Sequence, residues 1–159
     1  SIKEKYQENP AYYDSFSKRI KEALKQYKEK VISEAEYLAK MRSIMEDYHA
    51  GRSTVTYPDS IKNNVHAQAF YGVLTAIFDD AQEADVSPDF AAEIAVEITD
   101  IVARHSQVDW TNIKTIHDRI SQDIDDLFYG YEKNRGFKLT FETIDKIIEN
   151  VKTVALRRF

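Results

Sequence analysis

Residues 112–128 read NIKTIHDRISQDIDDLF, and this stretch decides the fold class. Its large apolar residues recur at spacings of three and four: Ile113, Ile116, Ile120, Ile124, Leu127 and Phe128. Because an α-helix has about 3.6 residues per turn, these spacings place the apolar side chains on one face. The same geometry turns Asp125 and Asp126 largely away from that face. The stretch therefore predicts an amphipathic helix whose isoleucines are buried and whose clustered acids are solvated.

Two further helices are predicted towards the N-terminus. Asn9 followed by Pro10 is typical of a helix start, since asparagine caps the first turn and proline fits its first position. Apolar residues then recur at helical spacing as far as Val31. Ser33 and Glu36 form a capping box, in which each side chain can bond to the other residue's backbone amide. A second helix therefore follows from Ser33 and runs as far as residue 50.

The remaining start signals complete an all-α prediction. Residues 61–77 are apolar on more than one side, which predicts a third helix at the centre of the fold. Ser87-Pro88 starts a fourth helix that reaches about His105, and Thr140 caps a last one. The alternation of apolar residues over 137–141 has no partner strand, and we interpret it as a tight connection. The prediction is one bundle-like domain of about six helices over residues 1–159.

Length and composition agree with one domain. A chain of 159 residues with 43% apolar content can bury one core. It has no cysteine, so disulfides, thiolate nucleophiles and cysteine zinc sites are excluded. The absence of a run of about 18 apolar residues and of a secretory leader predicts a cytoplasmic protein with no membrane contact. Ser1 in place of methionine suggests a domain of a longer polypeptide.

The net charge of −5 is unevenly distributed. Residues 1–50, 51–132 and 133–159 carry net charges of +1, −10 and +4. Such a distribution steers partners and does not determine a fold. Phosphate groups, if any bind, are expected at the two ends of the chain.

The sequence offers no recognisable catalytic motif, and we predict no catalytic residues and no metal site. With four glycines it has neither a Walker loop nor a G-x-G-x-x-G turn. The Glu-x-Lys element of nucleases is absent, and the four histidines form no H-E-x-x-H pair. A weaker hypothesis assigns a metal to Asp123, Asp126 and His117. The main interpretation is a domain that is not an enzyme by itself and needs no cofactor.

Basic residues of the first and last helices form a candidate surface for a nucleic-acid backbone or a nucleotide phosphate. Those of the first helix are Lys18, Arg19 and Lys21, and those near the C-terminus are Lys138, Lys146, Lys152, Arg157 and Arg158. The alternative is that they are solvated charges flanking the core stripe or complementing a helix dipole.

Trp110 is the only tryptophan and precedes the helix of residues 112–128. Its indole is expected to pack at the junction of the fourth and fifth helices, with Asp109 or Thr111 capping the fifth. The alternative is an aromatic anchor that faces a partner.

Several of these segments, in order, resemble one protein family. They are NPAYYDSFSKRI at 9–20, ISEAEYL at 32–38, YPDSIKNNVHAQAFYGVL at 57–74, DWT at 109–111 and DIDDLFY at 123–129. Together they look like the C-terminal helical region of the motor and restriction (R) subunit of type I restriction-modification enzymes. The similarity covers almost the whole chain, although residues 75–89 and 132–140 match no pattern of the family.

The resemblance implies a parent subunit that is an ATP-dependent, DNA-translocating type I site-specific deoxyribonuclease using ATP and Mg²⁺, with its nuclease and helicase domains upstream. It implies that this region docks the motor subunit onto the methyltransferase and specificity subunits, with the upstream helicase domains and DNA as further partners. The family offers no catalytic residue for these positions.

Overall fold

The computed structural model describes residues 9–51 and 55–159, and their regular structure is entirely helical. These ranges contain α2 (Pro10–Lys28), α3 (Glu34–Ala50), η1 (Asp59–Ile61), α4 (Val65–Asp80), α5 (Pro88–His105), η2 (Trp110–Asn112), α6 (Lys114–Arg135) and α7 (Phe141–Arg158). The prediction of an all-α, bundle-like fold with about six helices is confirmed. No described helix is long and apolar enough to cross a membrane.

Local capping signals start α2, α3, α5 and α7 where the sequence predicted them. The Asn9 side chain accepts a hydrogen bond from the Tyr12 amide at 3.3 Å. Both halves of the Ser33 capping box are formed at the start of α3. The hydroxyls of Ser87 and Thr140 accept from the amides three residues on, at 3.1 Å each. These caps satisfy backbone N–H groups that have no partner inside the helix.

The third helix begins later than predicted. Ile61 ends a short 3₁₀ turn, and the backbone leaves helical geometry at Asn64. The Asn64 side chain then accepts from the Ala67 amide at 3.0 Å and caps α4, which starts at Val65. The apolar spacing continues through this break, so periodicity alone could not detect it.

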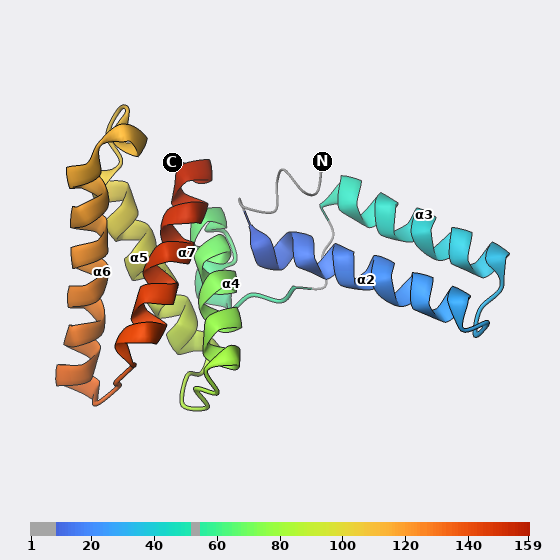
Figure 1. The fold of residues 1–159 in the computed structure, drawn as a ribbon, viewed down its shortest axis with the longest axis horizontal. Helices are drawn as coiled ribbons and strands as arrows, with labels where there is room; N and C mark the ends of the chain where they lie inside the picture. Colours follow the sequence, from blue (N-terminus) through green and yellow to red (C-terminus); the bar gives the residue numbers. More distant parts are fainter. Residues whose placement is uncertain (1–8, 52–54) are drawn as a thin grey trace.

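Helix α4 lies at the centre of the fold, as its apolar pattern predicts. It packs against α5, α7 and α2, and Figure 1 shows it between the C-terminal helices and the N-terminal hairpin. Phe70 and Leu74 are fully buried, and they meet a core to which α5, α6 and α7 contribute Ile98, Ile124 and Val151. Each large apolar side chain buried in this way contributes about 1.5–3 kcal/mol to folding.

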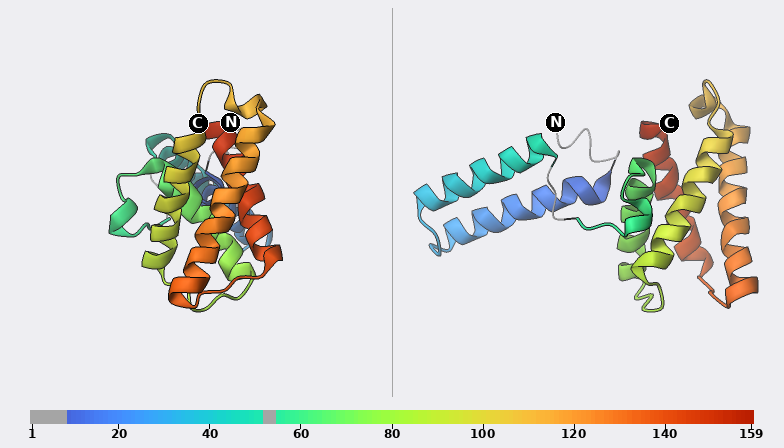
Figure 2. Two further views of the ribbon diagram at one scale, coloured as in Figure 1. Left: turned by 90° about the vertical axis from the view of Figure 1, so that its left-hand side faces the viewer. Right: turned by 180° about the vertical axis from the view of Figure 1, so that it is seen from behind.

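Helices α2 and α3 form an antiparallel hairpin, here called the arm, that projects from the body formed by residues 55–159 (Figures 1 and 2). Its own small core contains the fully buried Phe16, whose ring meets that of Tyr48 edge to face at 5.5 Å. An ion pair of 2.8 Å between Arg19 and Asp47 joins its two helices. The beginning of α2 packs against α4 of the body.

The arm is attached where the first turn of α2 crosses α4 at Gly72. A Cβ atom built on Gly72 would lie 2.6 Å from the Cβ of Ala11. This distance is far below van der Waals contact, so only glycine permits the two backbones to approach so closely.

Helix α6 ends at Gly136, which has a left-handed backbone with φ of 67°. Its amide donates to the carbonyl of Glu132 at 3.0 Å, and the amide of Phe137 donates to that of Tyr131 at 3.3 Å. Helices commonly end in this way at a glycine, because glycine adopts a left-handed backbone without steric cost. Residues 137–140 then lead to α7 without forming a strand, which confirms the predicted tight connection.

Two glycine-to-alanine substitutions test the arm attachment, because both glycines lie inside helices but only one is crowded. Gly72→Ala should destabilise the fold by about 1–3 kcal/mol, since its methyl group overlaps Ala11. Gly130→Ala, with nothing within 4 Å, should stabilise it by about 0.5–1 kcal/mol. Urea unfolding of both variants measures the difference, and a shift in the same direction for both would contradict the close crossing.

Candidate functional site

Trp110 is a core residue and is not exposed to a partner. It is 3% exposed, and its ring lies 5.3 Å from the imidazole of His117 on α6. The prediction that Asp109 or Thr111 caps the fifth helix is wrong. Residues 110–112 form a separate 3₁₀ turn, and α6 starts at Lys114 without a side-chain cap. Asp109 has a left-handed backbone with φ of 61°, which directs the chain into this turn.

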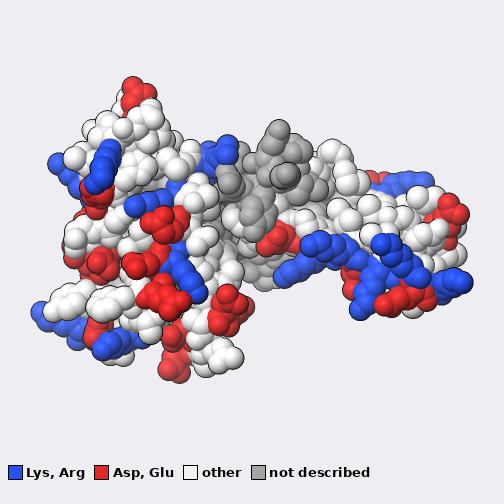
Figure 3. All heavy atoms as spheres, in the orientation of Figure 1, with Lys and Arg blue, Asp and Glu red and all other residues white. Residues whose placement is uncertain are grey.

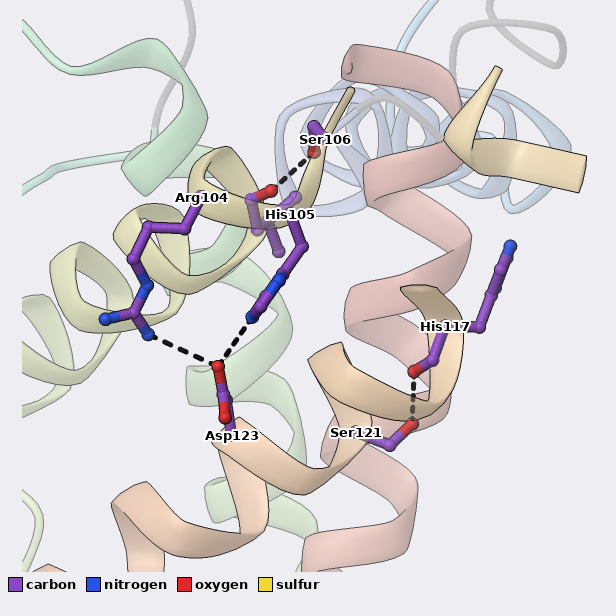
Figure 4. Close-up of polar contacts among 7 residues, drawn as sticks. Arg104, His105, Ser106, His117, Ser121 and Asp123 are labelled. Carbon is purple, nitrogen blue, oxygen red and sulfur yellow. Dashed lines mark hydrogen bonds and ion pairs between the residues drawn. The ribbon is translucent and has the colours of Figure 1, made fainter. Parts of the chain in front are cut away.

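The acids of residues 123–126 divide into one structural residue and two solvated ones. The carboxylate of Asp123 accepts a hydrogen bond from His105 Nε2 at 2.6 Å and a longer hydrogen bond from Arg104 at 3.4 Å (Figure 4). It therefore bridges α6 to the end of α5. Asp125 and Asp126 are exposed, as their helical positions predict.

The serines beside this bridge do not form a catalytic arrangement. Ser106 donates to the carbonyl of Val102, and Ser121 donates to the carbonyl of His117 at 3.0 Å (Figure 4). His117 Nε2 lies 2.9 Å from the carbonyl oxygen of Thr111. A serine nucleophile needs a hydrogen bond to a base, and both hydroxyls are instead bonded to their own helices.

The hypothetical metal ligands also have separate partners. Asp123 faces His105, whereas Asp126 accepts from Gln122 at 2.9 Å and His117 faces Thr111. Within residues 9–51 and 55–159, no three His, Asp or Glu side chains converge as metal ligands. The hypothesis of a metal held by Asp123, Asp126 and His117 has no geometric support.

The predicted basic residues on α2 lie on the arm. Lys18 and Lys21 are exposed, whereas Arg19 is held by Asp47. Lys18 lies seven residues, or about 10 Å, beyond Ala11 at the arm attachment. Figure 3 shows basic and acidic side chains interspersed over this face of the arm.

The predicted basic residues near the C-terminus are spread along α7. Lys138 lies before its start, 3.9 Å from Glu132, and Arg158 lies at its other end. An 18-residue helix is about 27 Å long. Lys146 and Lys152 pair with glutamates of their own helix at 3.6 and 3.9 Å, and Arg157 is exposed. The predicted residues of α7 are therefore distributed along the helix, and those of α2 lie on the arm.

Arg158 fastens the end of α7 to the start of α4. Its Nε donates to Nδ1 of His66 at 3.1 Å, and its Nη2 donates to the carbonyl of Val65 at 3.1 Å. The ring of Phe159 lies 4.4 Å from the His66 imidazole. The guanidinium group of Arg158 therefore has a structural role, since it holds the end of α7 to the start of α4.

A groove lies between the C-terminal half of α6 and the start of α7 and is here called the α6–α7 groove. Its volume is about 610 Å³. It is lined by Phe128, Tyr129, Leu139, Phe141 and Ile144, with Asp125, Asp126, Glu132, Lys138 and Thr140 around them. Tyr129 is 66% and Phe141 is 87% exposed.

Sequence reasoning missed this groove. The apolar alternation over 137–141 assigns Phe141 to a connection, although this residue follows the capping residue Thr140 directly. The residue directly after a helix cap lies in the first turn, at the end of the helix. The position of Phe141 directly after Thr140 was therefore the available signal for its exposure.

Comparison with protein families matches residues 1–155 to a family described as type I restriction enzyme HindI endonuclease subunit-like, C-terminal. This match confirms the resemblance inferred from the packing segments. Neither the curated proteins nor the solved structures include one that matches the chain.

The contact between His66 and Arg158 gives a pH-dependent prediction. Burial, and secondly the positive charge of Arg158, hold the pKa of His66 below its ordinary 6.5. Its neutral form is therefore favoured in the folded state. The resulting stabilisation is complete above pH 6.5 and is lost as the pH falls through the lowered pKa, because the unfolded chain takes up the proton first.

Proton NMR should show the His66 ring titrating below 6.5. In urea unfolding, the stability advantage of the wild type over His66→Gln should shrink from pH 8 to pH 5. A His66 midpoint at or above 6.5 would contradict this account.

Proposed function

Because the chain belongs to the family of type I restriction enzyme HindI endonuclease subunit-like C-terminal regions, we propose that it is a non-catalytic assembly domain. It docks the endonuclease subunit onto the methyltransferase and specificity subunits of the same enzyme. In this proposal the parent subunit is an ATP-dependent, DNA-translocating endonuclease. Its ATP and Mg²⁺ are held by upstream nuclease and helicase domains.

The distribution of exposed apolar side chains carries the proposal. Large apolar residues are exposed on the arm, including Val31 at 67% and Leu38 at 52%, and two aromatic side chains are exposed in the α6–α7 groove. Scattered exposed apolar residues are ordinary, but residues gathered around one concave surface are typical of interaction sites. The histidines and serines near the junction of α5 and α6 bond instead to neighbouring residues: His105 to Asp123, His117 to Thr111, Ser106 to Val102 and Ser121 to His117.

The alternative of DNA or nucleotide-phosphate binding has less support from the geometry. Arg19, Lys138, Lys146 and Lys152 each lie within 4 Å of a carboxylate, and Arg158 bonds to the start of α4. A basic side chain already paired with a carboxylate offers less net charge to a phosphate backbone. Lys18 and Lys21 are the exposed candidates on the arm, and Arg157 is the exposed candidate at the end of α7.

Removal of this region from the endonuclease subunit tests the assembly function. We expect the truncated subunit to retain DNA-stimulated ATPase activity and to lose co-purification with the methyltransferase and specificity subunits. Affinity purification of the co-expressed subunits measures assembly, and ATP hydrolysis with added DNA is the control for an intact motor. Normal assembly without the region would contradict the proposal.

A double substitution separates assembly from DNA binding. Lys18→Ala with Lys21→Ala should leave co-purification unchanged, because the proposed function does not use these lysines. A mobility-shift titration of the same variant at two salt concentrations measures DNA affinity. A large, salt-dependent loss of DNA affinity with unchanged assembly would favour the alternative.

A further inference from the structure

The α6–α7 groove is a preformed apolar surface. The buried side chains of Phe128, Leu139 and Ile144 contribute to its lining, and each belongs to the core of the body. Because these residues are fixed by core packing, the groove keeps its shape without a ligand. A preformed site avoids part of the ordering cost of binding.

Two aromatic side chains extend this apolar lining into solvent. Phe141 begins α7 directly after the capping Thr140, and Tyr129 lies on α6 beside the buried Phe128. Both line the groove, although their exposures of 87% and 66% show that the chain itself does not cover them. Exposed aromatic residues beside a concave apolar surface are typical anchors of protein interfaces.

The charges around the groove are mainly negative. Asp125, Asp126 and Glu132 line it, with Lys138 as the only basic lining residue. Lys138 lies 3.9 Å from Glu132 and offsets that one carboxylate. The charges of Asp125 and Asp126 remain, since the neutral amide of Gln122 is the partner of Asp126.

We propose that the α6–α7 groove binds a segment of the methyltransferase and specificity core in which an apolar side chain is flanked by lysine or arginine. The apolar side chain packs against Phe141 and Tyr129, and the flanking cations face Asp125 and Asp126. The inference rests on the proposed assembly function and names the surface that performs it.

Charge argues against a second copy of this chain as the occupant. A symmetric contact between two such grooves would place the aspartates of both copies at one interface. Facing carboxylates repel one another, whereas a basic partner segment is attracted and steered towards the groove.

The test measures the affinity of the chain for the purified methyltransferase–specificity complex by isothermal titration calorimetry. Phe141→Ala should weaken binding by about 30-fold or more, the loss expected of a central aromatic anchor. Asp125→Lys with Asp126→Lys should weaken it by about tenfold or more, because like charges then face each other. All three replaced side chains are exposed, so thermal unfolding curves should stay close to that of the wild type.

Val108→Ala is the matched control, because Val108 is 88% exposed and does not line the groove. It should bind like the wild type. The neutral pair Asp125→Asn with Asp126→Asn should bind more weakly at low salt and show less salt dependence than the wild type.

The remaining outcomes separate the groove from the assembly function. Tight binding by the wild type that Phe141→Ala and the lysine pair leave unchanged would overturn the groove assignment and leave the assembly function standing. No binding by the wild type would overturn both. Self-association in sedimentation experiments that Phe141→Ala abolishes would overturn the assignment in favour of a second copy.

Discussion

The burial of α4 on several sides is the constraint on which the other helices depend. A helix that exposes apolar residues in more than one direction is stable only when other elements cover each of them. Helices α5 and α7 cover two sides of α4, and the first turn of α2 covers another at Gly72. The absence of a side chain at Gly72 permits this third contact, so one position in α4 determines where the arm leaves the body.

Features set by neighbouring residues could be predicted from the sequence, and features set by distant residues could not. The caps at Asn9, Ser33 and Thr140 depend on three or four consecutive residues, and all of them form. The projection of the arm depends on the contact of Ala11 with a glycine 61 positions later. No local pattern contains that information, so the prediction of a bundle did not include an arm.

The same distinction between features set by neighbouring residues and features set by distant residues applies to the candidate site. Helical spacing correctly placed Asp125 and Asp126 in solvent, because their orientation depends on α6 alone. The partner of Asp123 is His105, 18 positions earlier on another helix, and only the fold brings the two together. Phe141 was not recognised because its exposure depends on where the body places the start of α7.

Helix α6 combines core packing with the lining of the α6–α7 groove, and the two do not conflict. Consecutive residues on a helix differ by about 100° in direction, so Ile124 and Asp125 are neighbours in sequence but face the core and the solvent. A charge change at Asp125 can therefore alter recognition while leaving the packing of Ile124 intact. Phe128 and Tyr129 repeat this division one turn later, with the buried ring supporting the groove and the exposed ring available to a partner. The spacing of residues 112–128 that determines the helix thus also separates the residues that hold the domain together from those that remain exposed at the α6–α7 groove.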